Sequence, residues 1–303
     1  MKIHLLSNPK NTVWDTKESN IDKTFSFSKS PWNSDIWVAN QEGPLRNMLE
    51  QAIVLNRKKP KACILWTHEP YFSTTTQTRT TIYDCPIYIF NIWNGRALKQ
   101  NATFLLQKYP TSFPQKPSRR DTWISKERPI CALMTYPQSN ASFTQERLSY
   151  AVSGHNEGIV DIYGKGWPPG YSIANSRDGD WHVSKPTILK NYDYNLALEN
   201  CVQPYYVTEK LWDSILNNCV PIYCDNGTIY NDFQRSSFFD VRDFRTPEKL
   251  WEKIRSTSVS EWNQRMNLCW DDMETLWKRY VKCPETFWRG TIEEIQATLE
   301  NLT

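Results

Sequence analysis

Short apolar runs alternate with longer amphipathic stretches along most of the chain. Brief runs of mainly apolar residues predict strands at 3–7, 36–39, 62–66, 87–91, 130–134, 159–163, 194–198 and 220–223. Apolar positions spaced three and four residues apart predict helices at 43–56, 143–153, 209–217, 247–254 and 260–280. Because strands separated by helices favour parallel sheets, the pattern predicts an α/β protein.

Segment 111–129 interrupts this pattern, because it is rich in proline and charge and poor in aliphatic residues. Such a composition is typical of a hinge. We therefore predict two α/β domains, 1–122 and 123–284, with residues 285–303 forming a C-terminal helix that packs back on the first domain. Ligands of open parallel sheets bind beyond the carboxyl ends of the strands. The informative residues should therefore follow strands.

Composition narrows the class of protein without assigning a function. Of the 303 residues, 39% are hydrophobic and 14% are aromatic, which is enough for an ordered core and argues against disorder. The formal net charge of +3 is too small for an electrostatic grip on nucleic acid, so no such partner is expected. The most basic stretches, 57–61 and 116–120, are interpreted as a solvated loop and a basic linker.

The sequence also bears on location and redox state. No stretch approaches the ~20 apolar residues of a membrane helix, and the first residues turn polar too early for a signal peptide. We therefore expect a cytoplasmic protein, unless a leader has been removed. The eight cysteines include no CxxC pair, which favours reduced thiols over a zinc site or a disulfide framework. The sequence leaves the oligomeric state open.

The densest chemical signal lies between residues 194 and 225. A strand ends in Glu199-Asn200, a polar and aromatic loop follows, and Thr208 is placed to cap a helix that begins with Glu209-Lys210. A helix N-terminus offers unpaired N–H groups and a partial positive charge, so the segment is a candidate anion site. A capped surface helix with an acid and a base in its first turn is the alternative interpretation.

Three pieces of this segment resemble the signature of the α-1,3-fucosyltransferases, glycosyltransferase family 10. They are Leu198-Glu199-Asn200, Tyr206-Val207-Thr208-Glu209-Lys210 and Val220-Pro221-Ile222, in the order and spacing of the family. Weaker similarities extend over about residues 60–250. They lie at Trp66-Thr67-His68-Glu69-Pro70, at Ser139-Asn140 with Arg147-Leu148, at 160–164 and at 238–244.

The resemblance implies a GT-B arrangement, in which two Rossmann-like domains face a cleft, and a donor site for GDP-fucose. By the matching motifs, Glu209 would hold the ribose hydroxyls and Lys210 the diphosphate. Arg147 and Tyr206 would also reach the phosphates, and Asn200 would line the donor pocket. Further candidates for this pocket are Tyr163, Gly164, Glu199, Tyr205 and Thr208.

The resemblance also implies an inverting transfer of L-fucose to a hydroxyl of a glycan acceptor, with Glu69 as general base. A single displacement needs one base and no carboxylate nucleophile. The leaving diphosphate needs a metal ion or fixed positive groups. Arg147, Lys210 and the helix N-terminus can supply the positive groups, so we expect no metal ligands and no required cofactor beyond the donor substrate.

Some motifs have competing interpretations. Asp178-Gly179-Asp180 could chelate a metal–diphosphate, as such triplets do in another glycosyltransferase fold, but its surroundings favour a turn. His68 could orient Glu69 or be a hydrogen-bonded polar residue. The aromatic segment Trp167–Tyr171 could border the sugar, although a packed aromatic loop is favoured.

Two other function classes stay open. Leu198 and Cys201 depart from the family pattern, which motivates a transferase of the same fold with a different nucleotide-sugar donor. The many aromatic residues also suit a non-catalytic glycan-binding protein. The set of phosphate-facing candidates argues against the last class, because a glycan binder has no use for it.

Overall fold

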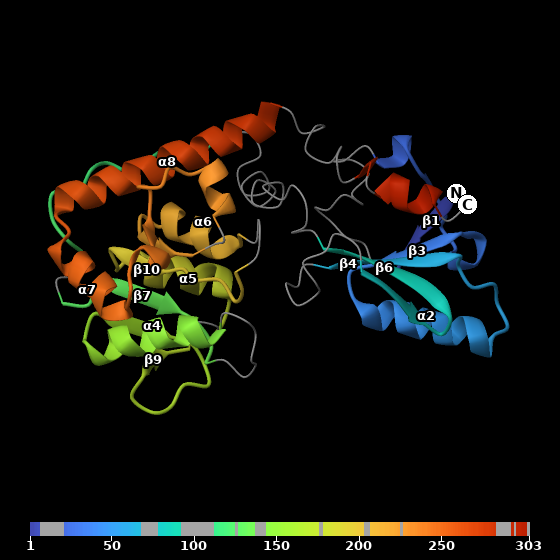
Figure 1. The fold of residues 1–303 in the computed structure, drawn as a ribbon, viewed down its shortest axis with the longest axis horizontal. Helices are drawn as coiled ribbons and strands as arrows, with labels where there is room; N and C mark the ends of the chain where they lie inside the picture. The colour runs from blue at the N-terminus through green and yellow to red at the C-terminus, as the bar shows by residue number, and fades with distance from the viewer. Residues whose placement is uncertain are drawn as a thin grey trace. The chain divides into compact units, whose positions relative to one another are not determined.

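The chain is described by a computed structural model, and it divides into two compact units (Figure 1). The first unit comprises residues 1–111 and 278–303, and the second comprises residues 112–277. The units therefore divide after residues 111 and 277. The boundaries that we predict after residues 122 and 284 stay predictions. The structure describes residues 1–6, 21–67, 78–91, 112–124, 127–136, 144–175, 178–202, 207–224, 227–282, 292–293 and 295–301.

The first unit contains a six-stranded sheet in the order β2-β1-β3-β4-β6-β5. Neighbouring strands are parallel except β5 and β6, which form an antiparallel hairpin. The elements are β1 (Lys2–Leu5), η1 (Ile21–Lys23), β2 (Ser26–Phe27), η2 (Pro31–Asn33), β3 (Ile36–Ala39), α2 (Glu42–Val54), β4 (Ala62–Thr67), β5 (Thr78–Ile82) and β6 (Cys85–Asn91).

Both faces of this sheet are covered by apolar side chains. Helix α2 runs along one face (Figure 1), where Leu45, Leu49 and Ala52 are buried against the strands. Their spacing places them on one side of a helix, as an amphipathic segment requires. On the other face, Ile295 and Leu299 join the core cluster of β1, β3 and β4. These two residues belong to the segment that we predict to return to the first domain.

The second unit contains an all-parallel sheet in the order β12-β11-β10-β7-β8-β9. Its strands are β7 (Ile130–Leu133), β8 (Val160–Tyr163), β9 (Ser172–Ala174), β10 (Tyr194–Leu196), β11 (Val220–Tyr223) and β12 (Phe239–Asp240). The chain builds outward from β7 to β9, then returns to the middle and builds outward from β10 to β12. This is the Rossmann order, and its direction reverses between β7 and β10.

Helices connect and flank these strands. In Figure 1, α4 and α8 lie on opposite sides of β7 and β10. Helix α6 buries Leu211, Trp212 and Ile215 on one stripe, which fixes its inner face. The elements are α4 (Thr144–Asn156), α5 (Trp181–Leu189), α6 (Glu209–Leu216), η3 (Thr228–Asn231), η4 (Val241–Asp243), α7 (Pro247–Ser256) and α8 (Val259–Lys282).

Most of the segment predicted as a hinge is bonded to the second unit. Arg120 donates to the fully buried Asp193 carboxylate at 2.7 Å, and its guanidinium lies 4.1 Å from the centre of the Trp262 ring. Lys116 forms an ion pair with Asp271 on α8. The basic residues of 116–120, interpreted from sequence as a linker, therefore hold residues 112–124 against β10 and α8 of this unit.

The α/β class with two Rossmann-like parallel sheets is confirmed. Strands β3 and β11 have the predicted bounds, whereas β2, β5, β9, β12 and α5 were not predicted. The seven cysteines in the described ranges are free and buried, in agreement with reduced thiols. Within those ranges, no helix is long and apolar enough to cross a membrane.

Candidate functional site

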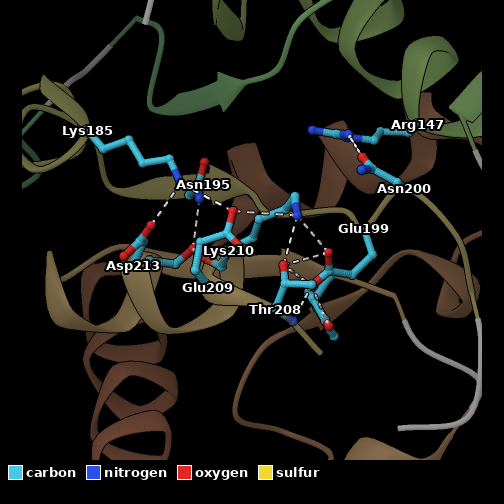
Figure 2. Close-up of polar contacts among 11 residues, drawn as sticks. Arg147, Lys185, Asn195, Glu199, Asn200, Thr208, Glu209, Lys210 and Asp213 are labelled. Atoms are coloured by element: carbon cyan, nitrogen blue, oxygen red, sulfur yellow. Dashed lines mark hydrogen bonds and ion pairs between the residues drawn. The ribbon is translucent and has the colours of Figure 1, made fainter. Parts of the chain in front are cut away.

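The candidate site lies at the carboxyl edge of the second sheet, where the strand order reverses between β7 and β10. Helix α4 follows β7 and helix α6 follows β10, so both helices begin at this edge. Ligands of doubly wound sheets bind at this point of the fold. Arg147 lies near the start of α4 and is 7% exposed. Its guanidinium donates to the side-chain oxygen of Asn200, so two predicted donor-site residues meet (Figure 2).

A buried carboxylate organises the other side of the site. Glu199 follows β10 and has no exposed surface. Its oxygens accept from the backbone N–H of Thr208 at 2.7 Å, from the Lys210 ammonium at 2.8 Å and from the Tyr223 hydroxyl at 3.2 Å. A buried charge is stable only when it is paired and hydrogen-bonded. Glu199 therefore holds Thr208 and Lys210, at the start of α6, beside the end of β10.

Thr208 occupies the predicted N-cap position of α6, but its hydroxyl does not cap the helix. The hydroxyl donates instead to the Glu199 carboxylate at 2.8 Å. A capping bond would need the hydroxyl oxygen as acceptor, and this oxygen instead accepts from the charged Lys210 ammonium at 2.8 Å. The expected capping bond is therefore wrong. The Thr208 side chain does not cap α6, whose first turn carries the positive end of the helix dipole.

Lys210, in the first turn of α6, is held within this network. Its Nζ atom donates to Glu199 and to the Thr208 hydroxyl, each at 2.8 Å, and lies 3.7 Å from Glu209. Burial lowers the pKa of Lys210, but the Glu199 and Glu209 carboxylates outweigh it and leave the pKa raised. An ammonium has three N–H donors, and contacts among the described residues use two of them. The side chain is 17% exposed.

Glu209 interacts with two cations. It lies 3.4 Å from the ammonium of Lys185, on α5, which also forms a 3.0 Å ion pair with Asp213 (Figure 2). Burial raises the pKa of the Glu209 carboxyl, but the Lys210 and Lys185 ammonium groups outweigh this and lower it to about 2. Lys185 was missed from sequence, because Pro186 within α5 obscured the helix that carries it.

The depressed pKa of Glu209 predicts a pH dependence of stability. The carboxylate contributes stability above its ordinary pKa of 4.5, and this contribution is lost as the pH falls toward about 2. Over this window, the free energy of unfolding of the wild type should therefore fall more steeply than that of Glu209→Gln. In Lys185→Met the excess slope should shrink, because one cation is gone. Thermal unfolding as a function of pH measures this, and parallel curves for wild type and Glu209→Gln would contradict it.

Buried polar contacts also hold α6 on the sheet. Asn195 in β10 donates to the Ser214 hydroxyl at 2.8 Å, and Ser214 donates to the Lys210 carbonyl at 2.7 Å. The side chains of Asn195 and Ser214 are buried. This chain of bonds fixes the first turn of α6 relative to β10. The positions of Glu209 and Lys210 are therefore set by the sheet as well as by Glu199.

Two further donor-pocket candidates lie at the end of β8. The Tyr163 hydroxyl is 2.8 Å from that of Tyr192, and Tyr163 packs in an apolar cluster with Cys131 and Leu189. It is therefore part of the packing, and no described contact joins it to Arg147. A Cβ on Gly164 would lie 2.0 Å from the Met134 carbonyl oxygen, so only glycine fits this close approach.

Other candidates fall outside the described residues or are confirmed as packing. Glu69, His68, Tyr205 and Tyr206 lie outside the described residues. Trp167 packs against Tyr136 and Tyr171, and its indole N–H donates to the Met134 carbonyl. This confirms the packed aromatic loop.

The Asp178-Gly179-Asp180 triplet lies in a turn before α5, with Gly179 at φ 77°. The Asp178 backbone N–H donates to the Asn175 carbonyl, and the Asn175 side chain donates to the Asp178 carboxylate. The turn interpretation is therefore confirmed. Among the residues that the structure describes, no group of three or more His, Cys, Asp or Glu could hold a metal ion.

The site thus presents a helix N-terminus and three cations, Arg147, Lys185 and Lys210, beside the carboxylates of Glu199, Glu209 and Asp213. The Glu199 and Asp213 carboxylates hold Lys210 and Lys185 in place. Arg147 approaches from another helix, and its charge opposes the rise in the pKa of Lys210 that Glu199 and Glu209 cause. An incoming diphosphate would relieve the repulsion between these two cations, so the arrangement suits an anionic ligand.

Comparison with known proteins gives a match over this same unit. A sequence model of the family "Glycosyltransferase family 10 (fucosyltransferase) C-term" matches residues 124–288, more than half of the chain. An 86-residue stretch is 30% identical to the alpha-(1,3)-fucosyltransferase FucT of Helicobacter pylori, over 28% of this chain and 16% of that protein. A 136-residue stretch is 33% identical to GDP-fucose protein O-fucosyltransferase 3 of Bos taurus, over 43% of this chain and 28% of that protein.

These alignments span less than a third of the length of either relative. A crystal structure of an alpha1,3-fucosyltransferase with GDP-fucose also matches, at 16% identity and a TM-score of 0.49. That match covers 93% of this chain and 90% of the other.

Proposed function

This chain belongs to glycosyltransferase family 10, and from that premise we propose that it transfers L-fucose from GDP-fucose to a hydroxyl of a glycan acceptor. The observation that carries the proposal lies at the switch point of the family-matched unit, where Arg147 donates to Asn200 and Lys210 pairs with the neighbouring Glu199. These residues come from two different helices and one loop. Their position at the edge where Rossmann sheets bind nucleotides supports a donor site there.

The donor would be held through its diphosphate and ribose. Arg147 offers a planar fork of donors that matches phosphate oxygens, and Lys210 offers its ammonium group. The N-terminus of α6, which the Thr208 side chain does not cap, adds its dipole and backbone donors. Glu209, held by Lys185, accepts hydrogen bonds from the ribose hydroxyls. These fixed positive groups stabilise the charge that gathers on the departing GDP, so the proposed chemistry is independent of metal.

The transfer is a single displacement with inversion at the anomeric carbon. The Glu69 carboxylate takes the proton of the acceptor hydroxyl, and the acceptor oxygen forms a bond to the anomeric carbon. The bond from that carbon to the β-phosphate oxygen breaks, and its electron pair leaves with GDP. In the sequence, Glu69 comes two residues after the end of β4, and the family resemblance gives it the role of the base.

Replacing Glu69 by glutamine should separate chemistry from donor binding. The amide cannot accept the proton, so kcat should fall by about 10²–10⁴-fold, while the Kd for GDP should stay within about twofold. Steady-state transfer rates and calorimetric titration with GDP measure the two effects. Glu42→Gln, at the exposed start of α2, is the matched control and should keep the wild-type rate. A wild-type rate in Glu69→Gln would exclude Glu69 as the base.

The overall proposal is tested by incubating the full chain with GDP-fucose and an acceptor array, followed by mass spectrometry. We expect one deoxyhexose to be added to a glycan. The match to a protein O-fucosyltransferase favours a second candidate acceptor, a protein hydroxyl, so the array includes folded Ser- and Thr-bearing domains. Thermal shift with GDP-fucose, GDP-mannose and UDP-sugars identifies the donor, since a ligand of the native state raises its stability. Stabilisation by UDP-sugars alone would overturn the GDP-fucose assignment.

A further inference from the structure

The end of helix α2 exposes apolar side chains that the fold does not use. Ile53, Val54 and Leu55 are 49%, 81% and 57% exposed, and they follow one another in the sequence. The buried face of α2 is made by other residues, Leu45, Leu49 and Ala52. Polar residues at these three positions would serve the core equally well. We call these three residues the apolar ridge.

Four cations follow the apolar ridge directly. Arg57, Lys58, Lys59 and Lys61 are all exposed, and we call them the basic loop. No aspartate or glutamate occurs between residues 51 and 66. Proteins rarely expose contiguous apolar residues without a partner for them, and here the apolar residues adjoin concentrated positive charge.

Backbone geometry keeps the ridge and the loop together. Asn56 has φ 48°, a left-handed conformation that asparagine tolerates and that ends the helix. The Asn56 N–H donates to the Ile53 carbonyl and the Arg57 N–H to the Ala52 carbonyl, which is the Schellman arrangement. The chain direction therefore changes at Asn56, and the basic loop begins directly at the C-terminal end of α2.

The hairpin turn between β5 and β6 completes this surface. The Lys59 ammonium donates to the Tyr83 carbonyl at 3.0 Å, and the Tyr83 hydroxyl donates to Glu50 on α2. Tyr83 is 39% exposed and has φ 49° at the turn. Its ring thus lies where the helix, the basic loop and the hairpin meet. Tyrosine is a residue that favours the boundary between water and apolar lipid.

We propose that the apolar ridge and the basic loop dock the first unit on the surface of an anionic phospholipid bilayer. The ridge enters the upper acyl region, and the basic loop binds the phosphates of the headgroups. Charge complementarity selects this partner, because four clustered cations beside apolar side chains match a surface that is negative above and apolar below. The acidic groups nearby are few: Asp35 lies 3.8 Å from Lys58, Glu50 is bonded to Tyr83, and Asp84 adjoins the turn.

The test is sedimentation of the full chain with vesicles of phosphatidylcholine and phosphatidylserine, beside vesicles of phosphatidylcholine alone. We expect binding to the anionic vesicles that weakens as salt rises. The variant R57Q/K58Q/K61Q should lose about fivefold in affinity for each charge removed. The variant I53S/V54S/L55S should lose more than about tenfold, because its apolar contribution is gone.

Ile173→Ser is the matched control, since Ile173 is 57% exposed on β9 of the second unit and should keep wild-type vesicle binding. Thermal unfolding checks that every variant is folded, and GDP affinity, which depends on the proposed donor site in the second unit, should be unchanged in the ridge and loop variants. Failure of vesicle binding therefore leaves the proposed fucosyl transfer untouched, and the reverse also holds. No binding to anionic vesicles at low salt would overturn the proposal. Wild-type affinity of either I53S/V54S/L55S or R57Q/K58Q/K61Q for the anionic vesicles would also overturn it.

Discussion

Lys210→Met is expected to destabilise the second unit and to abolish measurable GDP binding. The substitution leaves the carboxylate of Glu199, which has no exposed surface, without its cation. Removing one partner of a buried ion pair costs about 3–5 kcal/mol. For a unit of this size, the expected fall in Tm is roughly 10 °C. Calorimetry and thermal unfolding of the purified variant measure both effects.

A double variant separates the two roles of Lys210. In Glu199→Gln/Lys210→Met the buried charge is gone, so most of the lost stability should return. GDP affinity should stay at least about tenfold below wild type, because the donor to the diphosphate is still absent. If GDP affinity returned together with stability, Lys210 would serve only to neutralise Glu199, and its place in the donor site would be wrong.

An exposed ion pair supplies the control for this experiment. Lys249 and Glu252 on α7 form a 2.7 Å pair whose side chains are 61% and 59% exposed. Exposed pairs contribute little to stability, so Lys249→Met should change the free energy of unfolding by less than about 1 kcal/mol. The contrast with Lys210→Met isolates the effect of burying the carboxylate.

Arg147→Ala is expected to slow transfer strongly, because it removes the guanidinium proposed to face the departing diphosphate. Removing one preorganised donor to a developing charge costs about 10²–10³-fold in kcat. Arg147→Lys should recover part of the rate, because it restores the charge but not the planar fork. Steady-state rates with saturating GDP-fucose measure the series.

Arg128→Ala is the control for Arg147, since Arg128 is a partly exposed arginine, paired with Asp161. It should keep the wild-type transfer rate. Stability is measured in parallel, because Arg147 is 7% exposed and its loss also affects packing. A rate for Arg147→Ala within about threefold of wild type would show that its guanidinium does not face the leaving group.

Elements whose apolar residues follow a regular pattern were predictable from sequence, and elements without such a pattern were not. Strands β3 and β11 read as apolar runs and are buried at every position. Strand β5 reads Thr-Arg-Thr-Thr-Ile, which lacks an apolar run, and it forms because β6 lies beside it. Helix α5 contains Pro186, which argues against a helix in sequence alone. Tertiary contacts decided these elements.

The candidate site was partly predictable. Motif order selected Arg147, Asn200, Glu209 and Lys210, and the described contacts bring Arg147 to Asn200. Sequence could not show that Glu199 accepts from both the Thr208 hydroxyl and the Lys210 ammonium, because these contacts depend on how the start of α6 lies beside the end of β10. Lys185 had no motif at all. Its role follows only from the position of α5 beside α6.

The most direct test of the account is a calorimetric comparison of GDP with GMP. The central claim is that Arg147, Lys210 and the start of α6 bind a diphosphate. Wild-type protein should therefore bind GDP at least about tenfold more tightly than GMP, and this preference should shrink in Arg147→Ala, where only Lys210 and the start of α6 remain. Equal affinities of the wild type for the two nucleotides, or an undiminished preference in Arg147→Ala, would contradict the claim.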